Sequence, residues 1–389
     1  MTYDGGPEAA LSKRRASAGV SSMLCLRLLL ATSLGSGFEP GLAAPADSIP
    51  GQVPAPVVIH SAPVDGRVLR ADFEVPRQVL LVFTQTWPRA SAAIAAQVLD
   101  SGTRLALVRE RDSARLALTR FVTKLERAHG QPITTHADAV DTPWVRDWGP
   151  LQLRRAGGGS LWLDAALDDA LRAHDDGAPG WLARHHAVAL DALPWAVDGG
   201  AFISNGAGLC VLSLDYLDAR GVTSDTEALP ELLGQLGCRV TAVVPTLVAE
   251  HTKHVDMIAQ FVGPDRLMVA RIVDEPGGAS EDALRLEAAE RGIRAAAALL
   301  DEGVTLDVVH VPTPPSEPGR NPRSYVNGLR LADRYLMPSY PELGPPWQRE
   351  AQAAVQEAVG ELPVVAIDAS DMIGAGGAIH CATLGLWTD

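Results

Sequence analysis

The sequence predicts an α/β fold made of repeated modules, and three observations lead to this prediction. Between residues 78 and 129, apolar strand-like runs alternate with segments of helical composition. Four apolar hairpins follow, with helical stretches between them. One polar residue recurs in the leading strand of each hairpin. Together these features favour similar modules arranged around a common axis.

The first part of the fold shows the alternation most simply. Apolar runs at residues 78–83 and 103–108 predict strands, and residues 90–99 and 114–129 have helical composition and spacing. Further helices are expected at residues 281–300 and 346–359. The order strand, helix, strand, helix is typical of the α/β class.

Each of the four hairpins pairs two apolar runs across a turn rich in glycine, asparagine or aspartate. The paired segments are 144–153 with 160–163, 198–203 with 209–212, 254–262 with 267–270, and 325–331 with 335–338. The leading strands carry Asp147, Asp198, His254 and Asn327, and Cys381 lies near the end of the chain. Intervals of 51 to 73 residues separate these five positions. Equivalent strands of modules around an axis would bring all five together at its centre.

Composition limits the classes of partner. The chain has 389 residues and a formal net charge of -14, which argues against a nucleic-acid partner, because proteins that bind nucleic acid usually present a basic surface. The acidity is compatible with a cationic substrate.

Residues 1–46 are expected to form an export signal. Lys13-Arg14-Arg15 gives a basic start, Met23 to Leu34 is an apolar run, and Gly41 to Ala46 offers small residues for cleavage. The apolar run is too short and too quickly interrupted for a stable membrane span. The expected location is therefore secreted or periplasmic. The alternative is a disordered extension on a cytoplasmic protein.

We expect residues 47–60 to be a linker and residues 61–389 to form a single catalytic domain. Three cysteines remain once Cys25 is assigned to the signal: Cys210, Cys238 and Cys381. Cys210 and Cys238 lie in apolar runs, and we expect buried thiols there, with a disulfide between them as the alternative. Because an odd number of cysteines leaves at least one thiol free, Cys381 is the natural candidate.

The recurring polar residues have complementary chemistry. His254 and Asp256 are two positions apart on a predicted strand, which would place both on one face. A cysteine thiolate such as Cys381 is a strong nucleophile when a base or a favourable charge is near. Asp147 lies between Trp144 and Trp148, a combination that suits a planar cation. His251 and His254 would point to opposite faces of an extended segment, so we predict no metal.

At this point the residues carry a resemblance. The sequence is similar, over residues 60–389, to the agmatine deiminase and bacterial-type peptidylarginine deiminase family. The matching motifs, in chain order, are Asp141-Thr142-Pro143-Trp144-Val145-Arg146-Asp147-Trp148-Gly149-Pro150, Asp198-Gly199-Gly200, His254-Val255-Asp256-Met257-Ile258-Ala259, Ser324-Tyr325-Val326-Asn327 and Gly376-Gly377-Ala378-Ile379-His380-Cys381-Ala382-Thr383. The resemblance implies the pentein fold, a pseudo-fivefold α/β propeller of ββαβ-type modules around a buried site.

The resemblance also implies a set of roles. Cys381 would attack the guanidinium carbon, Asp147 and Asp256 would hold the guanidinium nitrogens, and His254 would transfer protons. Trp144, Asp198 and Asn327 would contact or support the substrate. No metal or organic cofactor is implied. Two departures from the family pattern concern the substrate contacts: Asp198-Gly199-Gly200-Ala201 replaces Glu-Gly-Gly-Asn, and Lys253 replaces a glycine before the histidine.

The implied substrate is a small cationic guanidino compound or an arginine-containing peptide. Agmatine, giving N-carbamoylputrescine for putrescine and polyamine synthesis, is the first expectation. Peptidylarginine is the alternative, with Arg154 and Arg155 as candidate contacts for a substrate carboxylate, although both are expected to be solvated turn charges. A pentein that binds a guanidino group without turnover, and an amidino transferase, are further alternatives.

Overall fold

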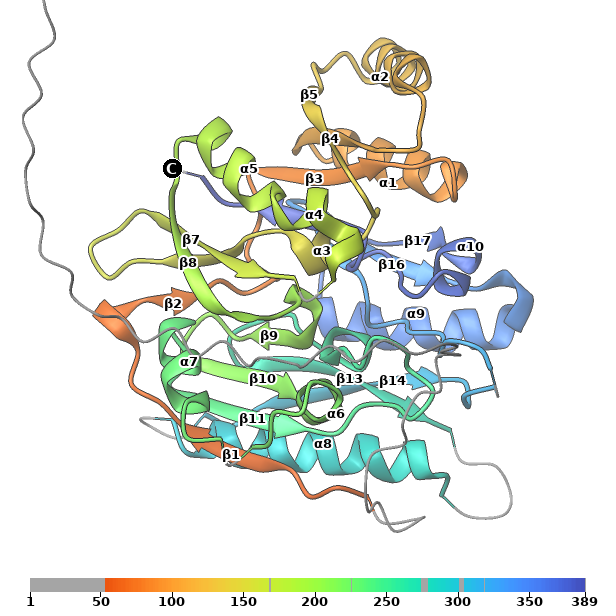
Figure 1. Cartoon of the computed structure of the whole chain (residues 1–389). Helices are drawn as coiled ribbons and strands as arrows, with labels where there is room; N and C mark the ends of the chain where they lie inside the picture. Colours follow the sequence, from red (N-terminus) through yellow and green to blue (C-terminus); the bar gives the residue numbers. More distant parts are fainter. Residues whose placement is uncertain are drawn as a thin grey trace, which may run out of the picture. The chain divides into compact units, whose positions relative to one another are not determined.

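The computed structural model describes residues 53–388 except 168, 225, 274–278, 301–303 and 318. The expected export signal at residues 1–46 lies outside the described residues. The described residues belong to one compact unit, which contains all the elements discussed below (Figure 1).

The described strands form five sheets. They consist of β18 (Thr383–Leu386), β3 (Gln78–Phe83), β4 (Arg104–Glu110) and β5 (Thr134–Val140); β2 (Val68–Leu69), β6 (Leu151–Arg154), β7 (Ser160–Ala166) and β8 (Ala189–Ala196); β1 (Val57–His60), β11 (Val240–Val244), β10 (Leu209–Ser213) and β9 (Phe202–Ser204); β12 (Ala259–Phe261), β13 (Arg266–Ile272) and β14 (Asp307–Thr313); and β15 (Leu329–Arg330), β16 (Tyr335–Ser339) and β17 (Val364–Asp368).

The same unit recurs in every one of these sheets. A short leading strand pairs antiparallel with a second strand, which pairs parallel with a third; β12, β13 and β14 are one example. Helices connect the two parallel strands, as a parallel pair requires. These helices are α1 (Pro88–Asp100), α4 (Ala173–Asp176) with α5 (Ala178–His186), α6 (Leu214–Ala219) with α7 (Leu229–Gln235), α8 (Glu281–Ala298) and α9 (Pro345–Val359). The repeated α/β module predicted from the sequence is confirmed.

One module is assembled from both ends of the described chain. The last strand, β18, pairs antiparallel with β3, which pairs parallel with β4. The strand β3 is buried along its whole length, because its apolar side chains are covered on both faces. This pairing fixes the segment before β18, which contains Cys381.

The remaining helices are α2 (Arg115–His129), α3 (Val145–Trp148) and α10 (Ser370–Gly374). The helix α2 follows β4 and ends at Gly130, whose φ of 68° gives the left-handed cap that glycine adopts without strain. No helix among the described residues combines the length and the apolar character needed to cross a bilayer.

The leading strands begin later than the sequence predicted. Asp147 lies in α3 and Asp256 lies in the 3-10 turn Val255–Met257, while β6 and β12 start at Leu151 and Ala259. Asp198 and Cys381 likewise precede their strands in tight turns, closed by hydrogen bonds from Ala201 N to Asp198 O and from Thr383 N to His380 O. The prediction that His254 and Asp256 share one face of a strand is therefore wrong. Tight turns, rather than strands, present the polar residues.

The predicted linker also needs correction at its end. Val57–His60 forms β1, which pairs antiparallel with β11. The run Val57-Val58-Ile59 is rich in β-branched residues, which fit a half-buried strand, and Ile59 is buried. Residues 57–60 thus belong to the fold.

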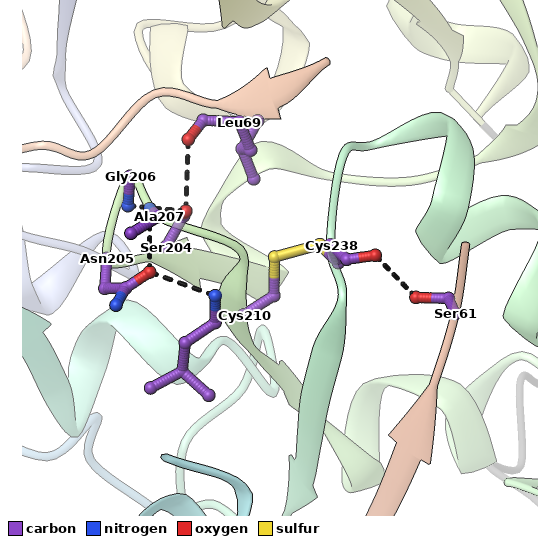
Figure 2. Close-up of a disulfide and its surroundings, with 9 residues drawn as sticks. Ser61, Leu69, Ser204, Asn205, Gly206, Ala207, Cys210 and Cys238 are labelled. Atoms are coloured by element: carbon purple, nitrogen blue, oxygen red, sulfur yellow. Dashed lines mark hydrogen bonds between the residues drawn. A yellow bond between two sulfur atoms is a disulfide. The ribbon is translucent and has the colours of Figure 1, made fainter. Parts of the chain in front are cut away.

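Cys210 and Cys238 form a disulfide between β10 and the turn before β11 (Figure 2). The expectation of two buried thiols is therefore wrong, and the pairing that the sequence left open is the one adopted. Cys210 lies in β10 and Cys238 lies two residues before β11, its parallel neighbour, and their Cα atoms are 5.7 Å apart. Around the bond, Ser61 Oγ donates to Cys238 O at 2.6 Å, and the side chain of Asn205 accepts from Leu209 N at 3.0 Å.

Candidate active site

Cys381 lies in the turn that leads into β18, and it is buried. Among the described residues it is the one cysteine outside the disulfide. Its backbone carbonyl accepts from Arg146 N at 3.1 Å, which ties the turn to α3. Gly377 lies against its side chain: a Cβ there would stand 3.0 Å from Cys381 Sγ and 2.9 Å from the Trp144 ring. The glycine therefore allows the thiol and the indole to lie close together.

Asn327 holds the cysteine from the neighbouring module. Its Nδ2 donates to Cys381 Sγ at 3.3 Å and to Asp256 O at 3.2 Å. Its Oδ1 accepts from His380 N at 3.1 Å and from Cys381 N at 3.4 Å. One fully buried amide thus fixes the positions of the thiol and of the Asp256 turn.

Asp256 also contacts the thiol, with its Oδ2 3.8 Å from Cys381 Sγ. The same oxygen lies 2.7 Å from His380 Nδ1. His380 Nε2 in turn forms an ion pair with Asp72 Oδ2 at 3.2 Å, and Asp72 Oδ1 pairs with Arg146 Nη1 at 3.0 Å. A line of alternating charges therefore runs behind Asp256 and fixes the orientation of its carboxylate.

His254 forms a second group with two carboxylates. Its Nδ1 lies 3.7 Å from Asp147 Oδ1, and its Nε2 lies 3.3 Å from Asp198 Oδ2. The backbone N–H of His254 donates to the fully buried Glu250 at 2.8 Å. A Cβ on Gly200 would stand 2.5 Å from His254 Nδ1, so the second glycine of the Asp198-Gly199-Gly200 motif makes room for the ring.

The charges around the site shift several pKa values. Burial opposes the protonation of His254, but Asp147, Asp198 and Asp256 raise its pKa to about 9. Burial raises the pKa of Asp147 to about 7, with Asp198 adding to the effect and His254 opposing it. Burial, followed by the negative charges of Asp256 and Asp147, raises the pKa of the Cys381 thiol well above its ordinary value. At neutral pH the site therefore holds a neutral thiol and an imidazolium.

The carboxylates of Asp147 and Asp256 can each accept a further hydrogen bond. Asp147 Oδ1 and Asp256 Oδ1 are buried and have no hydrogen-bond partner. A buried unpaired carboxylate oxygen is costly, by about 1–3 kcal/mol or more. Both aspartates act electrostatically on Cys381, so the site is suited to a cation that donates to two carboxylates next to a thiol.

The structure thus brings together all seven residues predicted from the sequence. Cys381, Asp256 and Asn327 are in direct contact, as are His254, Asp147 and Asp198. Trp144 lies at the same place, next to Gly377, with its ring centroid 4.8 Å from that of Trp87.

Sequence reasoning missed the supporting residues. His380 and Arg146 stand directly beside Cys381 and Asp147 in the motifs, so adjacency was a usable signal. The guanidinium of Arg146 pairs with Asp72. Nothing in the sequence marked Asp72, which lies outside the motifs.

Two further arginines act on the site. Arg220 Nη2 pairs with Asp198 Oδ2 at 3.0 Å, and its guanidinium lies 3.6 Å above the Tyr216 ring. Arg172 pairs with Asp175 at 2.9 Å, and although burial opposes the shift, the charges of Asp147, Asp175 and Asp198 raise its pKa. In contrast, Arg154 donates to Gly206 O from an exposed position. Of the described arginines, Arg172 and Arg220 are therefore better placed than Arg154 to meet a substrate.

A model of the Porphyromonas-type peptidyl-arginine deiminase family matches residues 70–386, which include all seven site residues. The chain belongs to this family. The pentein fold expected from the resemblance is confirmed by the fold of the solved relatives described next.

Individual relatives agree with the family assignment. A Legionella pneumophila protein provisionally named agmatine deiminase is 26% identical over 272 residues, covering 63% of this chain and 72% of its own length. The agmatine deiminase of Enterococcus faecalis superposes with a TM-score of 0.68 at 18% identity, covering 83% of this chain and 96% of that one. The agmatine deiminase of C. jejuni gives 0.67 at 14% identity, covering 86% and 97%.

Proposed function

We propose that the protein is a cysteine-dependent hydrolase that removes ammonia from a guanidino group and leaves a ureido product. The observation that carries the proposal is the pair of buried Asp147 and Asp256 oxygens, both without a hydrogen-bond partner, on two carboxylates that act on Cys381. The two carboxylates can accept hydrogen bonds from the N–H groups of a guanidinium, and the thiol can attack its electrophilic carbon.

The first half of the reaction forms a covalent intermediate. A bound guanidinium places positive charge between Asp147, Asp256 and Cys381, which offsets the charges that raise the thiol pKa. The thiol then loses its proton to solvent, and the resulting thiolate attacks the guanidinium carbon and forms a C–S bond. His254, protonated at neutral pH because its pKa is about 9, gives a proton to the departing nitrogen, and the C–N bond breaks to release ammonia.

The second half hydrolyses the thiouronium intermediate. His254, now neutral, takes a proton from water, and the resulting hydroxide attacks the same carbon. The C–S bond breaks, the departing sulfur takes up the hydroxyl proton as the C=O bond forms, and the neutral thiol is restored, leaving a ureido group on the substrate. The contact between His254 and Asp198 holds the ring in place through both proton transfers.

For the substrate we propose agmatine, which would yield N-carbamoylputrescine, a precursor for putrescine and polyamine synthesis. The support is the names of the relatives, three of which are agmatine deiminases or are named as such. Peptidylarginine remains the second candidate, and one observation favours it. Arg220 and Arg172 stand beside the site carboxylates, where they would attract a substrate carboxylate and repel the ammonium of agmatine.

The test is ammonia release from agmatine, free arginine and a peptide ending in arginine, with Cys381→Ala as the inactive control. Turnover of agmatine alone supports the proposal in full. Turnover of the peptide, reduced in Arg220→Ala, would replace agmatine by the second candidate. A folded wild-type protein that releases ammonia from none of the three would overturn the hydrolase proposal.

We also propose that the protein is exported and works in an oxidising compartment, with residues 61–389 and the strand β1 as its catalytic domain. The disulfide between Cys210 and Cys238 supports export, because structural disulfides are rare in the reducing cytosol. Cell fractionation and N-terminal sequencing of the expressed full chain test this. An uncleaved protein confined to the cytosol would contradict it.

A further inference from the structure

Three histidines gather away from the proposed active site. His136 lies on β5, and His185 and His186 are the last two residues of α5. One ligand atom from each lies within 4.8 Å of the others, and in the described part of the chain this is the one such group of three or more possible ligands. The rings pack against Trp181 and Trp162 rather than against Cys381 or its partners.

The cluster contains buried imidazole nitrogens without hydrogen-bond partners. His136 is 7% exposed, and both His136 Nε2 and His186 Nε2 are buried and unpartnered. Leaving a buried polar atom unpaired costs about 1–3 kcal/mol. Hydrophobic packing alone gives no reason to place two such atoms together, whereas a shared ligand for both nitrogens does.

We propose that His136, His185 and His186 bind one divalent transition-metal ion such as Zn²⁺, with water at the remaining position. Imidazole nitrogen is a preferred ligand of zinc, nickel and copper. A tetrahedral zinc site places nitrogens about 3.3 Å apart, from bonds of about 2.0–2.1 Å, so the cluster closes slightly on binding. His185 is exposed at the end of its helix and is free to make that adjustment.

The metal would join two segments that meet near the active site. It would connect β5 to the end of α5, and the segment that begins with Arg172 leads into α5. Asp175 lies between Arg172 and α5 in the sequence. It accepts hydrogen bonds from Asp141 N at 2.7 Å and Thr142 N at 3.1 Å, at the start of the motif that contains Trp144 and Asp147. The expected role is structural: the ion holds this segment in place.

The test is Zn²⁺ binding to the purified full chain after chelator treatment and dialysis, measured by calorimetry and metal analysis. All variants carry Cys381→Ser, so that the nucleophile does not compete for the ion. The main variant is His185→Ala, because His185 is exposed, whereas a substitution of the buried His136 could prevent folding. The matched control is His60→Ala, which removes another exposed histidine, on β1. Co²⁺ absorption gives a second readout that requires no enzyme activity.

We expect one Zn²⁺ per chain, an affinity at least tenfold weaker in His185→Ala, and no change in His60→Ala. Zn²⁺ should raise the unfolding temperature of the parent and of His60→Ala, but not of His185→Ala. The Co²⁺ spectrum should be that of nitrogen and oxygen ligands. Absence of binding, or equal affinity in His185→Ala, would overturn the proposal.

Discussion

His380 Nδ1 lies 2.7 Å from Asp256 Oδ2, and both side chains are completely buried. His380 also pairs with Asp72 at 3.2 Å. Although burial and Arg146 oppose protonation, the two carboxylates raise the pKa of His380. The histidine therefore acts as a buried cation that joins two anions, one of which faces the reactive thiol.

Replacing His380 by alanine should damage both stability and activity. The substitution leaves Asp256 and Asp72 in a buried site without their shared cation, and breaking a buried ion pair typically costs about 3–5 kcal/mol. We expect a loss of that size in urea unfolding, together with a fall in kcat/KM. The matched control is His310→Ala, since His310 pairs with Glu290 at 2.7 Å in a partly exposed place. That variant should lose about 1 kcal/mol or less; equal losses in the two would contradict this account.

Removing the charge of Asp147 should make Cys381 more reactive toward a neutral reagent while abolishing turnover. Asp147 is one of the two charges that raise the thiol pKa, so Asp147→Asn lowers this pKa and increases the thiolate fraction at a given mildly alkaline pH. The measurement is the pH profile of iodoacetamide labelling of the Cys381 peptide, which should shift to lower pH.

The control for this shift is Asp198→Asn. Asp198 contacts His254, and it is not among the principal groups that shift the Cys381 pKa. Its labelling profile should match that of the wild type. A Cys381 profile that is unchanged in Asp147→Asn, or shifted equally in both variants, would rule out direct electrostatic control of the thiol by Asp147.

The sequence allowed the module and the site to be predicted because both have local signatures. Alternating apolar runs mark the strands and helices, and the motifs around Asp147, His254 and Cys381 stand at module intervals. The supporting network had no such signature. Asp72 and His380 are about 300 residues apart, and only the pairing of β18 with β3 brings their segments together.

The three-histidine cluster was missed for the same reason. His185 and His186 are separated from His136 by about 50 residues, and neither segment has a recognised metal-binding spacing. The sequence predicts strands where Asp147 and Asp256 lie in turns, because apolar residues flank both aspartates. A tight turn and a strand start look alike when only hydrophobicity is considered.

Gly200→Ala should reduce activity sharply with little global change. The added Cβ would stand 2.5 Å from His254 Nδ1, so the ring must move away from Asp147 and Asp198. A displacement of about 1 Å in a catalytic group costs about 10²-fold in rate, and we expect kcat to fall by that order. The control is Gly374→Ala in α10, where a Cβ meets nothing within 4 Å. That variant should keep full activity, and an unaffected Gly200→Ala would show that the ring position is not critical.

Removing the disulfide should destabilise the fold and leave the chemistry intact. The bond closes a loop with a sequence separation of 28, for which the chain-entropy relation gives about 3–4 kcal/mol. Cys210→Ser with Cys238→Ser should lower the free energy of unfolding by about that amount, while kcat at low temperature stays unchanged. A reducing agent should destabilise the wild type equally and the double variant no further. Equal stability of wild type and double variant in urea would contradict a structural role.

Lys253 adopts a conformation that favours glycine. Its φ is 59°, and it stands directly before His254. A left-handed conformation costs a residue with a Cβ about 1–2 kcal/mol, and the greater freedom of glycine in the unfolded chain offsets about 0.4–1 kcal/mol of that. Lys253 Nζ also donates to Val248 O at 2.7 Å, so the useful comparison is between two variants that both lose this bond.

We therefore expect Lys253→Gly to be more stable than Lys253→Ala by about 0.5–1 kcal/mol in urea unfolding. The same pair of substitutions at Lys124, exposed within α2, should give the opposite order, because glycine costs about 1 kcal/mol relative to alanine in a helix. If alanine were the more stable residue at both positions, the backbone at Lys253 would not be strained. If glycine is the more stable residue at position 253 and alanine is the more stable residue at position 124, the backbone of Lys253 is strained in the turn that positions His254, the proposed proton donor.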